Sequence, residues 1–275
     1  MGTPTVRVGG VPEHFNLPWL LALSEGRFAE VGIDVEFIEF PGGTGAIMAA
    51  LESGEIDVAT PLTEGAVTAI ANGNQSTLIS IWVDSPLLWG VHMAGESSAS
   101  SVEDAEGQRF AISRFGSGSE LMSRVMAEER GWNLNDDSWV VVGGLDGALV
   151  ALPEGDAEVF LWNMSMTQPH VDDGTFKRVG VFPTPWPSFA IAAGNAFIEA
   201  HPGLAETVAE VALSRASQFE LDEGSAAVVA ETYGLGVSDA LAWMTQVQWT
   251  APGTALDDEM LASVKDRMRS LGRIT

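Results

Sequence analysis

The stretch RFAISRFGSGSELMSRVMAEERG, residues 109–131, decides the predicted fold because its pattern indicates a complete strand–turn–helix unit. Residues 109–113 alternate in polarity and end in a small residue, as a buried strand does. Residues 114–119 form a glycine–serine turn, and residues 120–130 have apolar side chains at helical spacing before a terminal glycine. The unpaired N–H groups at the start of this helix favour an anion, and Arg114 and three serine hydroxyls lie nearby. We therefore predict that this turn forms half of a ligand pocket.

Similar units precede and follow this stretch. Strands are predicted at 5–10, 33–40, 54–59, 76–83, 86–93, 138–143, 157–161, 176–182 and 188–194. Helices are predicted at 17–31, 45–53, 64–72, 145–152, 163–172, 195–200, 202–222, 224–233, 238–246 and 255–271. Short β-loop-α repeats predict an α/β fold with a mostly parallel sheet. In such sheets the ligand binds beyond the carboxyl ends of the strands.

The composition limits the possible partners and chemistry. A net charge of −25, from 13 basic and 38 acidic residues, disfavours nucleic acid and anionic membranes as partners. The chain has no cysteine and only four scattered histidines, so neither a metal site nor any other cofactor is expected. We expect no transmembrane segment, because no apolar run approaches the ~18–20 residues that a membrane helix needs.

The acid excess and the start of the chain allow alternative interpretations. The charge indicates either an ordinary acidic protein or adaptation to high salt, and only the second predicts unfolding that depends on salt concentration. Met1 leads almost directly into the strand-like residues 6–10, without a signal-peptide pattern. We therefore expect a cytoplasmic protein if this start is native, and a periplasmic or extracellular one if a leader was removed.

Four motifs together resemble a known family. In chain order they are GRFAEVGIDVEF (26–37), PGGTGAIMAALESGEIDVAT (41–60), VEDAEGQRFAISRFGSGSE (102–120) and ALPEGDAEVFLW (151–162). Their order resembles the type II periplasmic binding proteins of ABC transporters, within the branch of sulfonate-, taurine- and thiamine-precursor-binding proteins. The PEHFN loop at 12–16 is similar to that of a leaderless, cytosolic subgroup.

This resemblance and the repeat pattern imply a two-lobe α/β fold with a ligand cleft. Lobe one would comprise 1–90 plus 188–275 and lobe two 91–187, with two hinge crossovers and a rigid proline connector at 183–187. The expected function is closure on a small organic ligand, anionic or heterocyclic, with an ABC permease as a possible partner. Trp162-Asn163 stand where the family often has an acid followed by proline, so the relatives' ligand does not transfer directly.

Candidate ligand-binding residues follow the predicted strands or lie at their ends. In lobe one they are His14, Phe15, Asn16, Gly43, Thr44, Thr63, Glu64 and Trp82. In lobe two they are Ser113, Arg114, Ser117, Gly118, Ser119, Trp162 and Asn163. Each has a structural alternative: the hydroxyls and Asn16 as helix caps, Glu64 as a first-turn acid, and the tryptophans as core residues.

Two other functions remain open from the sequence. One is an enzyme acting on a pyrimidine or another heterocycle, with His14 and Glu64 as an acid/base pair. The missing cysteines argue against a relation to the fungal pyrimidine-precursor synthases of similar fold, which use a cysteine-rich segment. The other is an interaction module formed by the helices of residues 195–271, which would need a large exposed apolar patch there.

Overall fold

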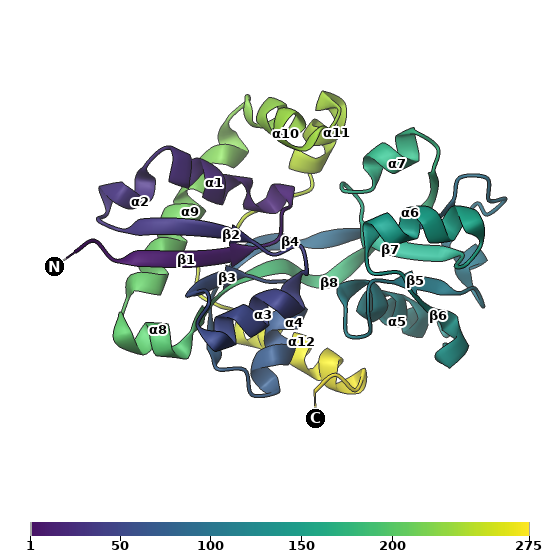
Figure 1. Cartoon of the computed structure of the whole chain (residues 1–275), viewed down its shortest axis with the longest axis horizontal. Helices are drawn as coiled ribbons and strands as arrows, with labels where there is room; N and C mark the ends of the chain where they lie inside the picture. Colours follow the sequence, from purple (N-terminus) through teal and green to yellow (C-terminus); the bar gives the residue numbers. More distant parts are fainter. Residues whose placement is uncertain (1, 275) are drawn as a thin grey trace. The chain divides into compact units, whose positions relative to one another are not determined.

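The computed structural model describes residues 2–274 and divides into two compact units. Unit 1 contains the residues up to Pro86 and those from Trp186 onward, and unit 2 is Leu87–Pro185. The chain passes from one unit to the other within two long strands, β4 (Ser76–Ala94) and β8 (Phe176–Gly194), labelled in Figure 1.

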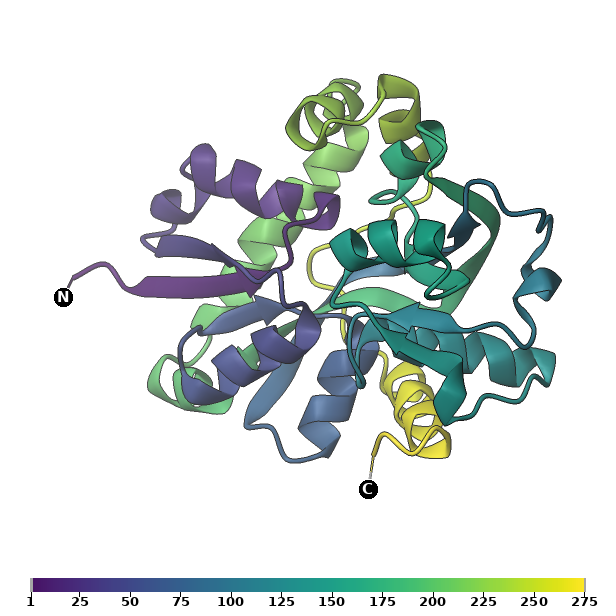
Figure 2. The ribbon, with the colours of Figure 1, turned by 45° about the vertical axis from the view of Figure 1, so that its right-hand side comes forward.

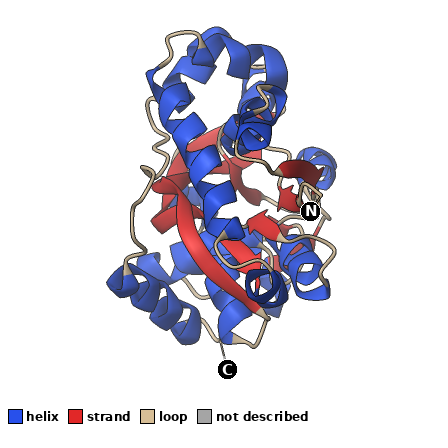
Figure 3. Ribbon diagram, turned by 90° about the vertical axis from the view of Figure 1, so that its left-hand side faces the viewer, coloured by secondary structure: helices blue, strands red, loops and turns tan. Residues whose placement is uncertain are grey.

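Unit 1 is built on β1 (Thr5–Gly10), which lies between β2 (Asp34–Glu39) and β3 (Val58–Thr60). Both pairings of β1 are parallel, and β3 pairs antiparallel with the end of β8. Figure 3 shows these strands between helices. The helices are the 3-10 turn η1 (His14–Asn16), α1 (Leu17–Ser24), α2 (Arg27–Glu30), α3 (Thr44–Ser53), α4 (Thr63–Ala71), α8 (Asn195–Ala200), α9 (Leu204–Leu221), α10 (Ser225–Tyr233), α11 (Val237–Met244) and α12 (Asp258–Ser270).

Gly10, at the end of β1, has no room for a side chain. A Cβ there would lie 2.7 Å from Asn16 Nδ2, Phe37 Cζ and Thr60 Oγ1. We expect Gly10→Ala to lower the free energy of unfolding by about 1–3 kcal/mol, because overpacking forces these groups apart. Urea denaturation followed by circular dichroism measures this change. Gly2→Ala is the matched control, since nothing lies within 4 Å of its added Cβ, and equal losses in both variants would contradict the prediction.

Unit 2 is built on β5 (Phe110–Ile112), which pairs in parallel with β6 (Trp139–Val141) and β7 (Val159–Asn163). Strand β7 also pairs antiparallel with β4, Trp89 opposite Asn163. Helices α5 (Gly118–Arg130) and α6 (Leu145–Glu154) lie on opposite sides of these strands in Figures 1 and 2. The remaining helices are η2 (Val102–Ala105), η3 (Asp136–Ser138) and α7 (Gln168–Asp172).

The core of unit 2 forms where α6 packs on β5 and β7. Phe160 and Phe176 are buried there beside small residues of β5 and α6, Ala111 and Ala148 among them. The small side chains let the helix approach the sheet closely, and the rings fill the volume between. This packing fixes the ends of β5 and β7, which carry the candidate residues of this unit.

The α/β fold class is confirmed, but the sheet is mixed rather than mostly parallel. The hydrogen-bonded strand order is β2-β1-β3-β8-β4-β7-β5-β6. The antiparallel pairs join β3 to β8 and β4 to β7. Both involve the long strands that connect the units, whereas the strands of the β-loop-α repeats pair in parallel as predicted.

The predicted breaks in the two long strands were wrong. Residues 76–83 and 86–93 belong to one strand, β4, and the proline connector at 183–187 is part of β8. The three prolines in β8 alternate along the chain, so their missing N–H groups all face the same edge of the strand. The residues between the prolines keep their backbone N–H donors on the other edge. The strand can therefore stay extended and hydrogen-bonded through the three prolines.

Several predicted boundaries also differ. Helix 17–31 is two helices, because Gly26 adopts φ 73° and ends the first. Strand 54–59 is shortened to β3, since Gly54 caps α3 in the left-handed conformation. Helix 163–172 is shortened to α7, with Asn163 still in β7. No helix among residues 2–274 is long and apolar enough to span a membrane.

Candidate ligand-binding site

The candidate residues of unit 1 follow three neighbouring parallel strands. His14–Asn16 follow β1, Gly43 and Thr44 follow β2, and Thr63 and Glu64 follow β3. Because β2, β1 and β3 pair in parallel, these three loops emerge at the same edge of the sheet. The structure therefore brings these candidates together within unit 1, and their roles in ligand binding stay predictions.

Asn16 holds the loop after β1 against the end of β3. Its Nδ2 donates to Val11 O at 2.8 Å, and its Oδ1 accepts from Thr60 Oγ1 at 3.0 Å. The side chain is buried and makes no capping bond to α1. The amide therefore serves to position the loop, rather than to cap the helix as the structural alternative proposed.

Phe15 and His14 lie in an aromatic cluster formed with β8 and the helices α10 and α11. The Phe15 ring is 4.9 Å from Phe189, and the His14 ring is 4.4 Å from Tyr233 and 5.3 Å from Trp243. Burial lowers the pKa of His14 to about 4, so its imidazole is neutral at neutral pH. Its Nδ1 has no hydrogen-bond partner within residues 2–274.

Trp82 lies in the core of unit 1. Its side chain is 0% exposed, and its indole Nε1 donates to the Phe15 carbonyl at 3.0 Å. Trp249 donates to the same carbonyl at 3.2 Å. Both indoles thus fix the backbone of η1. Trp82 is therefore a core residue, which was the structural alternative to a role in ligand binding.

Thr44 links the loops after β2 and β3. Its Oγ1 accepts a hydrogen bond from the backbone N–H of Leu62 at 3.0 Å. A Cβ on Gly65 would lie 2.4 Å from Thr44 Cγ2, so the starts of α3 and α4 are in close contact. The preceding Gly43 adopts φ 70°, a conformation that glycine enters without strain.

Glu64 is a buried carboxyl at the start of α4, with an exposed fraction of 1%. Its Oε2 accepts from the indole Nε1 of Trp186 at 2.8 Å. Burial raises the pKa of Glu64 to about 7, while its own N–H and the Trp186 N–H lower it. The neighbouring Thr63 is fully buried, and its Oγ1 has no hydrogen-bond partner in the described part of the chain.

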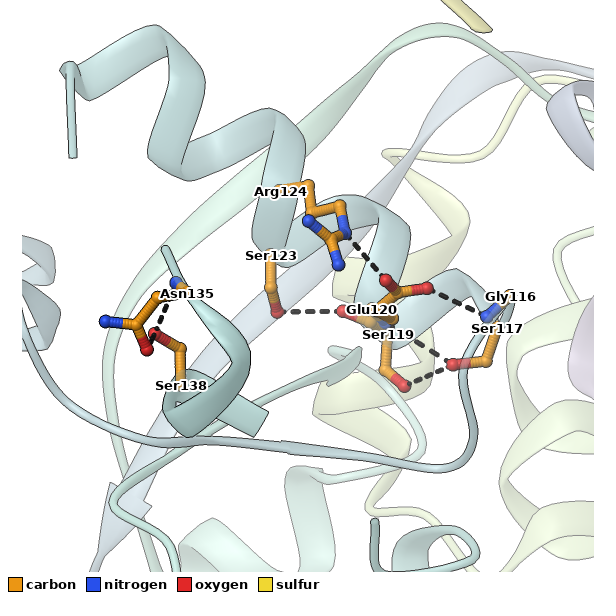
Figure 4. Close-up of polar contacts among 8 residues, drawn as sticks. All are labelled: Gly116, Ser117, Ser119, Glu120, Ser123, Arg124, Asn135 and Ser138. Carbon is orange, nitrogen blue, oxygen red and sulfur yellow. Dashed lines mark hydrogen bonds and ion pairs between the residues drawn. The ribbon is translucent and has the colours of Figure 1, made fainter. Parts of the chain in front are cut away.

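In unit 2 the glycine–serine turn is closed by hydrogen bonds of its own. Ser117 caps α5 and accepts from the Glu120 N–H at 3.4 Å, as predicted in the structural alternative. Ser119 Oγ accepts from the Ser113 N–H at 3.0 Å and lies 3.0 Å from Ser117 Oγ. Figure 4 shows the contacts of Ser117 with Ser119 and Glu120, and Ser123 donating one turn further on to the Ser119 carbonyl.

The carboxylate of Glu120 lies against this turn. Its Oε2 accepts from the Gly116 N–H at 2.8 Å, and its Oε1 accepts from Arg124 Nε at 2.6 Å (Figure 4). Arg124 in turn lies over the Trp139 ring, 4.5 Å from its centroid. Part of the donor capacity expected for a ligand anion is therefore taken by an acid of the chain itself, buried to 1% exposure.

The other candidates of unit 2 differ in exposure. Arg114 is exposed, Ser113 and Gly118 are half-buried, and no ion pair joins Arg114 to an acid in residues 2–274. Trp162 stacks on Phe160 with ring centroids 5.1 Å apart. Asn163 is buried, and its Oδ1 accepts from the Ser165 N–H at 3.0 Å.

A partly buried polar network holds the segment that follows Asn163. Arg178 donates to Met164 O at 2.9 Å and to Gln168 Oε1 at 2.8 Å. Its Nε is 3.3 Å from His92 Nε2, which also lies 2.9 Å from Thr167 Oγ1. Burial and the Arg178 charge lower the pKa of His92 to about 3, so the ring is neutral and its Nε2 accepts from Arg178 Nε.

Sequence reasoning missed several residues around the candidates. Trp186, Tyr233 and Trp243 contact Glu64 or His14 but lie far along the chain from them. No local pattern indicates such long-range contacts. The ion pair between Glu120 and Arg124 was not predicted, although their spacing of four residues is a local signal for a contact on one helix face.

The proposed acid/base pair gains no support from the contacts of the two side chains. His14 packs against aromatic rings and Glu64 accepts from Trp186. Within residues 2–274 no hydrogen bond or ion pair joins them, and no group of acids and histidines suits a metal ion.

Two units connected by strands β4 and β8, each with loops at the carboxyl ends of parallel strands, define the two-lobe type II periplasmic-binding-protein fold. The chain belongs to the family described as NMT1/THI5 like, which matches residues 12–225. A search of curated protein sequences found no match.

Solved structures share this fold over nearly the whole chain. A Candida albicans protein with the generic periplasmic binding protein fold is 25% identical, with TM-score 0.88 over 99% of this chain and 91% of the other. The alkanesulfonate-binding protein of Xanthomonas axonopodis pv. citri, bound to MOPS, is 16% identical, with TM-score 0.80 over 100% and 96%. The aliphatic sulphonate-binding protein of Escherichia coli is 15% identical, with TM-score 0.76 over 98% and 88%.

Proposed function

We propose that this protein binds a small organic solute, as the substrate-binding proteins of ABC-type importers do. The observation that carries the proposal is the match to the NMT1/THI5 like family over residues 12–225, combined with a shared fold in sulfonate-binding proteins. The candidate loops of unit 1 support it, because they combine aromatic rings with a few polar groups, as small-molecule sites do.

A thermal-shift screen tests this proposal directly. Sulfonates, carboxylates, amines and pyrimidines are added to the purified chain, at low and at high KCl because of its net charge of −25. A ligand that binds only the folded state raises the melting temperature as its concentration increases. If no compound of the four classes shifts the melting temperature in a concentration-dependent way, the proposed solute-binding function is refuted.

Three finer elements of the function are part of this proposal. The first is hinge closure at the crossovers in β4 and β8, which predicts a smaller radius of gyration in small-angle scattering when ligand is added. The second is delivery of the ligand to an ABC permease. The third is a surface adapted to high salt, which is supported by 38 acidic against 13 basic residues.

A further inference from the structure

Of the three acids that are buried among residues 2–274, Asp57 and Glu120 each have an arginine partner, although basic residues are scarce. Asp57 pairs with Arg7, Glu158 with Arg109 and Glu120 with Arg124, each at 2.6 Å. Glu25 pairs with both Arg27 and Arg215. In these pairs the positive charge of an arginine neutralises the negative charge of a carboxylate, which lowers the cost of burying the carboxylate.

Glu64 is different, because no basic side chain lies within ion-pair distance of it among residues 2–274. It is nevertheless among the most buried acids, with 1% exposure, and its hydrogen bond from Trp186 is uncharged. A carboxylate has acceptor sites on two oxygens, so the Trp186 indole N–H and the backbone N–H of Glu64 leave part of this capacity unused.

The residue beside Glu64 points to a missing partner as well. Thr63 is 0% exposed, and its Oγ1 makes no hydrogen bond to any described residue. Buried polar atoms in folded proteins are nearly always paired, so an unpaired hydroxyl next to a buried carboxyl with no cationic partner among residues 2–274 indicates a polar group that comes from outside the chain. Both residues follow β3, at the edge that also carries the loops after β1 and β2.

We propose that Glu64 is the counter-ion for a positively charged nitrogen of the ligand, an ammonium or amidinium group, with Thr63 as a second hydrogen-bond partner. This inference rests on the proposed solute-binding function and specifies the ligand class for the same site. A ligand cation would supply the positive charge that no basic side chain of residues 2–274 supplies to Glu64. An oxyanion would instead meet a carboxyl with no cation to screen it, at a cost that burial increases.

Taken by itself, the turn of unit 2 offers fewer free donors to an anion than its sequence indicates. The turn expected to hold an anion already has the Glu120 carboxylate on the Gly116 N–H. On this proposal the ligand class differs from that of the sulfonate-binding proteins, although the fold is the same. Proteins of the same fold can bind ligands of different charge, because the fold sets the positions of the loops and the side chains set the charge of the site.

The test uses probes with one ring and different head groups: benzylamine and benzamidine as cations, benzenesulfonate and benzoate as anions, and benzamide as the neutral control. Thermal shift and isothermal titration calorimetry measure their binding to the whole chain. We expect the cations to bind and the anions to be at least about tenfold weaker, as loss of a charge-assisted hydrogen bond predicts.

Variants assign the effect to Glu64. Glu64→Gln keeps the shape and an acceptor for Trp186, and should weaken cation binding by about tenfold or more. Glu220→Gln is the matched control, since Glu220 accepts from the Trp249 backbone N–H at 2.6 Å and is not a candidate residue, and it should bind as the wild type does. The melting temperature without probe shows whether each variant is folded.

The outcomes separate this inference from the proposed function. Binding of benzenesulfonate or benzoate without the cations would overturn the ligand class and leave solute binding intact. Equal cation binding by wild type and Glu64→Gln would overturn the role of Glu64. The absence of binding by every probe, together with no response in the wider screen, would overturn both proposals.

Discussion

Trp82→Ala is expected to lower the free energy of unfolding by about 3–5 kcal/mol, the usual cost of truncating a fully buried tryptophan. The Trp82 ring packs 5.4 Å from Trp19 and 6.5 Å from Trp249, measured between ring centroids. The substitution leaves a cavity among these rings and removes the Nε1 donor to the Phe15 carbonyl. Urea denaturation monitored by circular dichroism gives the difference in stability.

Two further variants make this prediction specific. Trp82→Phe keeps much of the ring volume but loses the N–H donor, so it should cost less than alanine, about 1–3 kcal/mol. Trp132→Ala, at a half-buried position in unit 2, should cost clearly less than Trp82→Ala. A Trp82→Ala protein with wild-type stability would mean that this indole is not part of the core.

Glu64→Gln is expected to stabilise the protein in alkaline solution and not in acid. The pKa of Glu64 is raised from 4.5 to about 7 in the folded chain, so the folded state favours the protonated form. Its contribution to stability is fully present below the unfolded pKa and is lost as the pH rises through the folded pKa. Glutamine stays neutral, so the variant should gain up to about 3 kcal/mol relative to wild type near pH 9.

Unfolding curves of both proteins near pH 5 and near pH 9 provide the measurement. Glu158→Gln is the control of opposite sign, because its hydrogen bond to Arg109 lowers the pKa of Glu158. That variant loses a paired carboxylate and should not gain stability in alkaline solution. Identical pH profiles for Glu64→Gln and wild type would show that Glu64 is solvated rather than buried.

Local sequence patterns predicted the repeated units well, and long-range packing limited the rest. The helical spacing predicted over residues 120–130 lies within α5 and ends where α5 ends, because the Ser117 cap and the Gly131 terminus are local signals. The continuity of β8 through Pro183 and Pro187 was missed, because three prolines normally interrupt pairing. The pairing direction of β4 and β8 has no local signal at all.

The candidate site shows the same division. The positions of His14, Thr44 and Glu64 after parallel strands followed from the order of strands and helices. The partners of these residues did not, because Trp186 and Tyr233 reach them from distant parts of the chain. Glu64 was a candidate from its position, and only the contacts among residues 2–274 showed that it has no arginine partner there.

The turn at 113–119 separates the two kinds of information most clearly. The sequence by itself determined a strand, a turn and a capped helix, since these depend on glycine, serine and apolar spacing within one short segment. It also determined the acid excess and the family motifs. Only the tertiary structure decided that Glu120 lies on the turn, because side-chain direction depends on packing with Arg124 and Trp139. The charge presented to a ligand therefore depends on which acids and arginines the fold brings together.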